Sequence, residues 1–326
     1  MPHNTLHEQL HKYLTDVHSI EVQALTQMKR APDMAGGPEL AEIYRRHERE
    51  TEEQKRLIEE RLEAHGESPN KLKDVVANVT GWGMVLFAKF NPDTPGKLAA
   101  HAHSYEAMEE AAYEFLWRVA EQADDDRTAQ VARQILEQEK AMKGRIYDHF
   151  DATVEASLRE KNAGDLEEEL VKSLADAHAI ESQAIQMLEA APKIVGDVPE
   201  LAVLFRDHLQ ETRAQQQILK SRLDAHDASP SRLQDAAMRL GALNLGGFFK
   251  VQRDTPAKLA GFTYAFEHLE IAAYEELKRV AARAGDEETV RVAERIAAEE
   301  RAMANAIAAN WEVALHASLE SVGAVA

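Results

Sequence analysis

The chain has 326 residues, 44% of them hydrophobic, and its 57 acidic and 38 basic side chains give a formal net charge of −19. Nucleic acids and anionic membranes require a basic surface on their partner, so this charge argues against both. The absence of cysteine excludes disulfides, thiolate nucleophiles, iron–sulfur clusters and cysteine-type zinc sites. Because the chain shows neither a signal peptide nor an apolar run of about 18 residues, we expect a cytoplasmic protein.

The sequence repeats itself after about 160 residues. DVHSIEVQAL at 16–25 returns as DAHAIESQAI at 176–185. Further matched segments are HERETEEQ with HLQETRAQ (47–54 and 208–215) and DTPGKLA with DTPAKLA (93–99 and 254–260). The repeat predicts two domains, residues 1–163 and 164–326, and a pseudo-dimer within one chain. Whether two chains pair further into a homodimer stays open.

Helical periodicity predicts four long helices in each half. In the first half they are expected at residues 3–29, 39–66, 94–123 and 125–158. Prolines and glycines separate the first two helices, Asp93 or Thr94 can cap the third, and three aspartates precede the fourth. Alternation of β-branched residues is nearly absent, so the predicted fold class is all-α.

A long connection, residues 67–93, links the second and third helices of the first half. One long crossover of this kind is typical of the ferritin-like topology, so we expect two ferritin-like four-helix bundles in tandem. The connections contain apolar, glycine-bearing stretches at 73–90 and 235–251. We expect these to cap the bundle or cover the face between the repeats, with a substrate channel or a membrane contact as the alternative.

Each predicted helix carries one glutamate within its apolar stripe. These glutamates are Glu21, Glu50, Glu109 and Glu139, repeated as Glu181, Glu211, Glu270 and Glu300. Four carboxylates in one core are costly unless protons, cations or metal neutralise them, and few Lys or Arg residues occupy the stripes. A sulfur-free set of carboxylates suits iron or manganese, with at most two ions per bundle.

Further candidates lie one helical turn from these glutamates. His47 and Glu106, repeated as His208 and Glu267, complete the predicted metal ligands. The residues expected to support them are His18, Gln54, Tyr113, His178, Gln215 and Tyr274. The histidines are also compatible with hydrogen-bonded core positions, and the tyrosines with core packing. Asp16 lies on another face than Glu21, which indicates a surface or inter-repeat contact.

At these residues the chain resembles the ferritin-like YciE/YciF-type family of bacterial stress proteins, present here in tandem. The shared patterns are D-x-x-x-x-E, H-x-x-E-T-x-x-Q, E-x-x-E-x-A-x-Y and E-K-A, carried by Asp16 and Glu21; His47, Glu50, Thr51 and Gln54; Glu106, Glu109, Ala111 and Tyr113; and Glu139-Lys140-Ala141. The second half carries the same patterns, with Arg301 replacing the lysine of the last. The resemblance implies a di-metal carboxylate bundle and a role in stress.

The fourth helix departs from di-iron bundles of the ferritin type. Met142 and Met303 stand three residues after its glutamates, where such bundles have histidine, and Lys143 and Ala304 follow. A lysine here is able to replace the charge of a metal. Two functions therefore stay open. One is a di-metal protein, for example an oxidoreductase, that handles iron, O2 or peroxide; the other is a metal-free helical scaffold.

Overall fold

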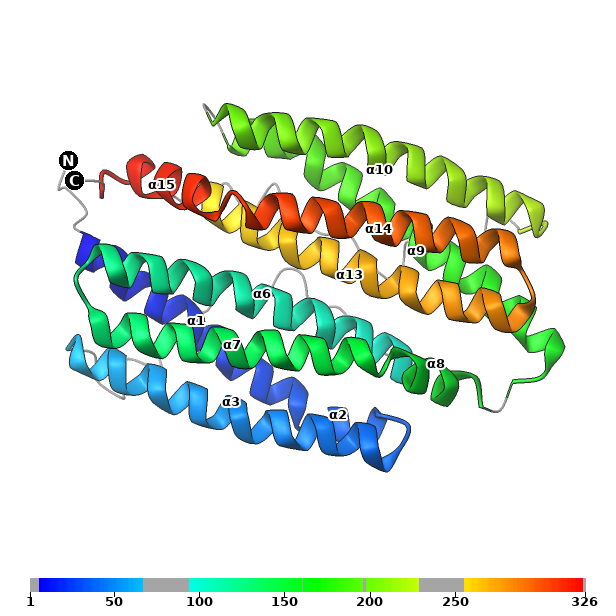
Figure 1. Ribbon diagram of the computed structural model, residues 1–326, viewed down its shortest axis with the longest axis horizontal. Helices are drawn as coiled ribbons and strands as arrows, with labels where there is room; N and C mark the ends of the chain where they lie inside the picture. Colours follow the sequence, from blue (N-terminus) through cyan, green and yellow to red (C-terminus); the bar gives the residue numbers. More distant parts are fainter. Residues whose placement is uncertain (1–5, 67–93, 160, 196–197, 229–254, 325–326) are drawn as a thin grey trace.

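The computed structural model describes the chain except residues 1–5, 67–93, 160, 196–197, 229–254 and 325–326. Over the described residues all regular structure is helical (Figure 1). The first half contains α1 (Leu6–Met28), α2 (Ala31–Met34), α3 (Pro38–Ala64), α6 (Pro95–Gln122), α7 (Asp126–Asp148) and α8 (Phe150–Leu158). The second contains α9 (Ala163–Ile194), α10 (Pro199–Ala225), α13 (Thr255–Ala284), α14 (Glu287–Ala308) and α15 (Trp311–Ser321). The all-helical prediction is confirmed for this part of the chain.

The helix boundaries follow local sequence signals. The Thr94 side chain accepts a hydrogen bond from the Lys97 N–H (3.2 Å), and Pro95 occupies the first turn of α6. Asp125 caps α7 by accepting from the Thr128 N–H (3.0 Å). The predicted fourth helix is divided in two, because the backbone at His149 leaves the helical conformation between α7 and α8.

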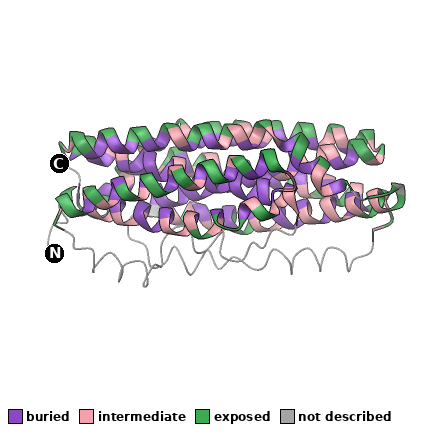
Figure 2. Cartoon of the chain, turned by 90° about the horizontal axis from the view of Figure 1, so that it is seen from below, coloured by how far each residue is buried: buried purple, intermediate pink, exposed green. Residues whose placement is uncertain are grey.

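The two halves meet along α6 and α13, which lie side by side at the centre of the molecule (Figure 1). Figure 2 shows that the buried residues line the inward faces of the helices. One hydrophobic core continues across both halves and includes Phe115 of α6 and Phe262 of α13. The Ser104 hydroxyl donates to the Ala265 carbonyl oxygen across this contact (2.6 Å). The tandem repeat thus forms a pseudo-dimer with a shared core.

Reciprocal ion pairs cross from one half to the other. Lys258 Nζ of α13 lies 3.2 Å from Asp16 Oδ2 of α1, and Lys97 Nζ of α6 lies 3.4 Å from Asp176 Oδ2 of α9. This confirms the inter-repeat contact expected for Asp16. The two pairs differ in burial, because the Lys258 side chain is 2% exposed and that of Lys97 is 23% exposed.

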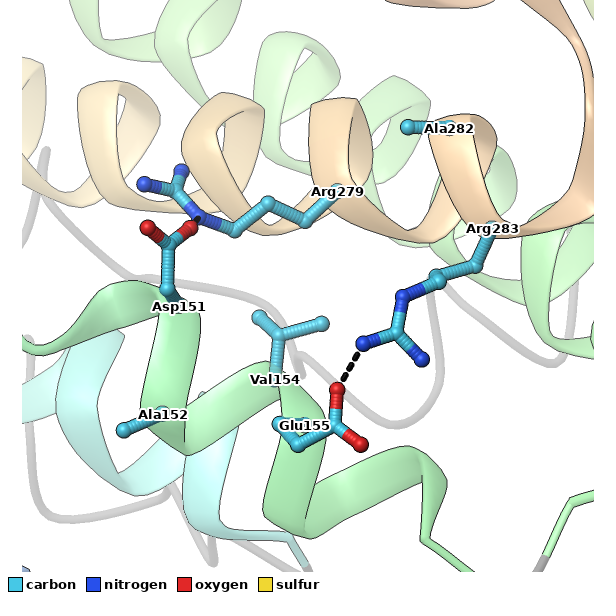
Figure 3. A pocket seen from close by; sticks show the side chains of 7 residues that line it. All are labelled: Asp151, Ala152, Val154, Glu155, Arg279, Ala282 and Arg283. Atoms are coloured by element: carbon cyan, nitrogen blue, oxygen red, sulfur yellow. Dashed lines mark hydrogen bonds and ion pairs between the residues drawn. The ribbon is translucent and has the colours of Figure 1, made fainter.

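A groove of about 430 Å³ runs between α8 of the first half and α13 of the second (Figure 3). Arg279 contacts Asp151 and Arg283 contacts Glu155 across it. The pseudo-symmetric pair joins Arg118 of α6 to Glu312 of α15 (2.7 Å). Such exposed pairs align the halves but each contributes at most about 1 kcal/mol.

The apolar stretches at 73–90 and 235–251 lie outside the described residues, so the expectations for them stay predictions. Within the described part of the chain, no helix combines the length and apolar character needed to cross a membrane.

Candidate metal centre

Three helices in each half direct acidic and imidazole side chains to one point in the core. In the first half α3 contributes His47, α6 contributes Glu106 and Glu109, and α7 contributes Glu139. One ligand atom from each lies within 4.8 Å of all the others, and all four residues are buried. We call this set the first centre. Glu106 and Glu109 reach the same point because residues three apart share a helix face.

The second half builds the same arrangement from the repeated positions. His208 of α10, Glu267 and Glu270 of α13, and Glu300 of α14 form the second centre, again buried and with ligand atoms within 4.8 Å of one another. One such cluster in each repeat makes a chance gathering of acidic residues an inadequate explanation.

The imidazole of each centre connects the buried carboxylates to a glutamate nearer the surface. His47 Nε2 lies 3.1 Å from Glu106 and 3.7 Å from Glu139, while Nδ1 lies 3.6 Å from Glu50. In the second centre His208 Nε2 lies 3.1 Å from Glu267, and Nδ1 lies 3.2 Å from Glu211. The Thr51 hydroxyl, one helical turn after His47, is buried and donates to the His47 carbonyl oxygen (2.9 Å).

Glu21 of α1 lies next to the first centre and is fully buried. The Tyr113 hydroxyl donates to its carboxylate, as the Tyr274 hydroxyl does to Glu181 in the second half. Gln54 Nε2 donates to Glu139. The equivalent bond from Gln215 Nε2 to Glu300 measures 2.6 Å. These tyrosines and glutamines therefore hold the carboxylates of the centres in place.

The structure corrects the expected seam of the second helix. Thr51, not Glu50, follows His47 on the buried face. Around the helix, Thr51 lies about 40° to one side of His47 and Glu50 about 60° to the other side. The core lies on the side of Thr51. The Glu50 side chain is 21% exposed and that of Glu211 is 59% exposed. Both glutamates thus lie at the rim of their centre.

His18 and His178 lie apart from the centres. His18 Nε2 contacts Glu59 (3.1 Å), and burial lowers the pKa of both histidines. Lys143 is also directed elsewhere, since its Nζ contacts Glu110, the Tyr264 hydroxyl (3.0 Å) and His268 Nε2 (3.3 Å). The idea that this lysine replaces a metal's charge stays a prediction, and its direct contacts are with Glu110 and with two residues of the other half.

Sequence reasoning missed the residues that bind the rim of the first centre. Arg46 Nε donates to Glu50 (2.9 Å), and an Arg145 guanidinium nitrogen of α7 donates to the same carboxylate (2.7 Å). The four-residue spacing of Arg46 and Glu50 was a visible signal. The contact from Arg145 depends on how α7 packs against α3, which no local pattern reveals.

The titratable groups in and beside the first centre have raised pKa values. Burial raises the pKa of Glu21 to about 8 and lifts the pKa of Glu109 and Glu139 well above the ordinary range of a carboxylic acid. Burial alone would lower the pKa of His47, but the Glu106 carboxylate raises it well above 6.5. Without a cation, the centre therefore retains protons at neutral pH.

The donor set fits a metal ion. Among the described residues, buried oxygens without a hydrogen-bond partner include Glu21 Oε2, Glu106 Oε1 and Glu109 Oε2 in the first half, and Glu181 Oε2, Glu267 Oε1 and both Glu270 oxygens in the second. Buried polar atoms are normally paired, so this concentration of orphaned oxygens calls for a partner. Oxygen and imidazole donors without sulfur are ligands of iron and manganese.

Comparison with known proteins identifies a matching family but no matching solved structure. The profile of a family described as "Domain of unknown function (DUF892)" matches residues 5–159 and again residues 165–320. No solved structure matches the chain. The two matched regions coincide with the two halves that each build one centre.

Proposed function

Because the chain belongs to the DUF892 family, which is of the ferritin-like type, we propose that each repeat is a ferritin-like four-helix bundle that binds iron or manganese. The proposed domains are residues 1–163 and 164–326. The observation that carries this proposal is the group of buried carboxylate oxygens in each half that find no hydrogen-bond partner among the described residues. Each bundle would hold at most two ions.

The ligands of the first centre would be His47, Glu106, Glu109 and Glu139. His208, Glu267, Glu270 and Glu300 would serve in the second. Glu21 and Glu181 supply one further carboxylate beside each centre, and Glu50 and Glu211 supply one at each rim. Bound iron or manganese would supply electron transfer to O2 or peroxide.

The chain's own residues prepare the site for a cation. Gln54 donates to Glu139 and so orients its remaining oxygen toward the centre, while Tyr113 does the same for Glu21. Burial excludes bulk water from the carboxylates. Protons held at Glu21 and Glu109 must leave when a cation binds, so binding is expected to strengthen as pH rises.

We place this function in the cytoplasm and in the response to general or oxidative stress. The motifs around His47 and Glu109 support this role through their likeness to bacterial stress proteins. The reactant would be ferrous iron, O2 or peroxide, and the activity would be that of a di-metal oxidoreductase. A further homodimer of the whole chain remains part of the proposal, to be measured by light scattering.

A metal-free scaffold is the second candidate. Met142 and Met303 are buried at the helix positions where a histidine ligand is expected, which favours loss of the redox site. Protonation is able to neutralise the glutamates of such a scaffold, as the raised pKa of Glu139 illustrates. Metal analysis separates the two functions.

The test uses the purified full chain, loaded anaerobically with Fe(II) or separately with Mn(II) and then freed of unbound ions. We expect at least one ion per repeat, together with a melting temperature that rises on loading. The double variant Glu139→Gln/Glu300→Gln should lose the bound metal. The matched control Glu137→Gln/Glu288→Gln changes exposed glutamates on the same two helices and should retain it. If the wild-type chain retains no metal after loading and its melting temperature is unchanged, the protein is a metal-free scaffold.

Reactivity is tested separately by admitting O2 to the Fe(II)-loaded chain. We expect consumption of O2 and growth of near-ultraviolet charge-transfer absorbance, both absent from the Glu139→Gln/Glu300→Gln variant. Retained Fe(II) that consumes neither O2 nor peroxide would restrict the function to metal binding.

A further inference from the structure

The two centres share their inner residues but differ at the rim. Within each centre the imidazole lies between buried glutamates and one rim glutamate, Glu50 in the first half and Glu211 in the second. The residues of the centres are at most 2% exposed, whereas the rim glutamates reach solvent. A cation that enters along the imidazole therefore meets the rim glutamate first.

The rim of the first centre is occupied by arginine. Glu50 accepts from Arg46 Nε (2.9 Å) and from an Arg145 guanidinium nitrogen (2.7 Å), and its side chain is 21% exposed. A cation can use this carboxylate only after the arginines have been displaced.

The rim of the second centre carries no such arginines. The repeat aligns Arg46 with Asp207 and Arg145 with Ala306, so neither donor has a counterpart. Among the contacts of the described residues, Glu211 has His208 as its one partner, and its side chain is 59% exposed. This carboxylate is open to solvent and free to receive a cation.

Charge reinforces the difference in exposure. Gln54 donates to the neutral Gln138 (3.2 Å), but Gln215 donates to the carboxylate of Glu299 (3.1 Å). The charges around the rim are compared over Glu50, Glu211, the partners of Glu50 and of Gln54 or Gln215 outside the centres, Arg295, which pairs with Glu299 (3.0 Å), and the aligned positions in the other half. These are Arg46, Glu50, Gln134, Gln138 and Arg145 in the first half, and Asp207, Glu211, Arg295, Glu299 and Ala306 in the second. Their formal charge is +1 in the first half and −2 in the second. A negative rim attracts cations and speeds their entry.

We propose that the two centres are not equivalent: the second centre exchanges its cation with solvent faster, and Arg145 is the main residue that slows exchange at the first. The inference rests on the proposed function, because it requires both centres to hold metal. It assigns the duplication a use, namely one rapidly exchanging centre and one retentive centre in a single chain.

The test follows Fe(II) release from the fully loaded chain to the coloured chelator ferrozine under anaerobic conditions. We expect two phases that differ in rate by about tenfold or more, the magnitude expected from charge-assisted hydrogen bonds at the first rim. Glu139→Gln should leave only the fast phase, from the second centre, and Glu300→Gln only the slow phase.

Substitution of rim residues then tests whether Arg145 causes the slow release of Fe(II). Arg145→Ala should accelerate the slow phase about tenfold, and Arg145→Lys should do so less. The reciprocal variant Ala306→Arg, at a half-buried position, should slow the fast phase. Far-ultraviolet circular dichroism and the number of bound Fe(II) ions establish that each variant is folded and loaded.

The outcomes separate this inference from the proposed function. A wild-type chain that retains no Fe(II) refutes the function itself. A loaded chain whose two centres release Fe(II) at one rate refutes the inference and leaves the function standing. Two phases that do not respond to Arg145→Ala would show that the rim arginine is not the cause.

Discussion

Replacing Glu21 by glutamine is expected to stabilise the metal-free protein by about 3 kcal/mol at pH 7. Glu21 is fully buried beside the first centre and accepts a hydrogen bond from Tyr113. Glutamine has the same shape and keeps an oxygen that accepts this bond. The substitution therefore removes the ionisable group with little change in packing.

The magnitude follows from the pKa of the buried carboxyl group. Burial raises the pKa of Glu21 from 4.5 to about 8. At pH 7 the unfolded state is ionised, so folding must take up a proton about 2.5 pH units above the unfolded pKa, at about 1.4 kcal/mol per unit. Stability that is present below pH 4.5 is thus lost as pH rises through 8. The gain from glutamine should be below about 0.5 kcal/mol at pH 4.5 and about 5 kcal/mol above pH 8.

Urea unfolding in EDTA, followed by circular dichroism, measures this effect at several pH values. Glu181→Gln should act alike in the second half, where burial also raises the pKa to about 8. The control Glu137→Gln alters a side chain that is 72% exposed and should change stability by less than about 0.5 kcal/mol. With Mn(II) bound, the gain should shrink or reverse because a carboxylate beside the ions is lost. A Glu21→Gln protein that is no more stable at pH 7, or equally stabilised at every pH, would refute the reasoning.

Two further predictions concern the architecture, both measured as changes in the free energy of unfolding in urea. Asp16→Ala removes a carboxylate beside the buried ammonium of Lys258 and should cost about 3 kcal/mol. Asp176→Ala removes one beside the more exposed Lys97 and should cost about 1 kcal/mol or less. Equal losses of stability would contradict the role given to burial. Gly36→Ala should cost about 2 kcal/mol or more, because Gly36 has a φ of +79° and an added Cβ would approach two side-chain carbons at 2.7 Å. Its neighbour is the control, since a Cβ at Gly37 would meet nothing within 4 Å, and a neutral Gly36→Ala would disprove the strain.

Helix positions and the inner residues of the centres could be predicted from local patterns. Apolar residues recur every three or four positions, and proline, threonine and aspartate mark the helix starts, as at Thr94 and Asp125. A glutamate within such a stripe, for example Glu109 or Glu139, is recognisable as a buried charge that needs a partner. The division of the predicted fourth helix at His149 was not recognisable, because no proline or glycine marks it.

Positions close to the edge of a stripe could not be assigned in the same way. Thr51 and Glu50 both lie within about 60° of His47 around the helix, and the packing of α3 against its neighbours decides which one is buried. Periodicity does not define the rotation of a helix that finely. The long side chain of Lys143 similarly had several surroundings within reach, and contacts with the other half selected one.

The sequence by itself determined that the protein is a duplicated, helical and acidic chain with glutamate and histidine in each core, because periodicity and repetition are local properties of residue order. Only the tertiary structure decided that four of these residues per half meet within 4.8 Å, that Arg145 closes one rim, and that Ala306 leaves the other open. The physical reason is that such contacts join helices far apart in the chain, and their geometry depends on how the side chains of the shared core pack.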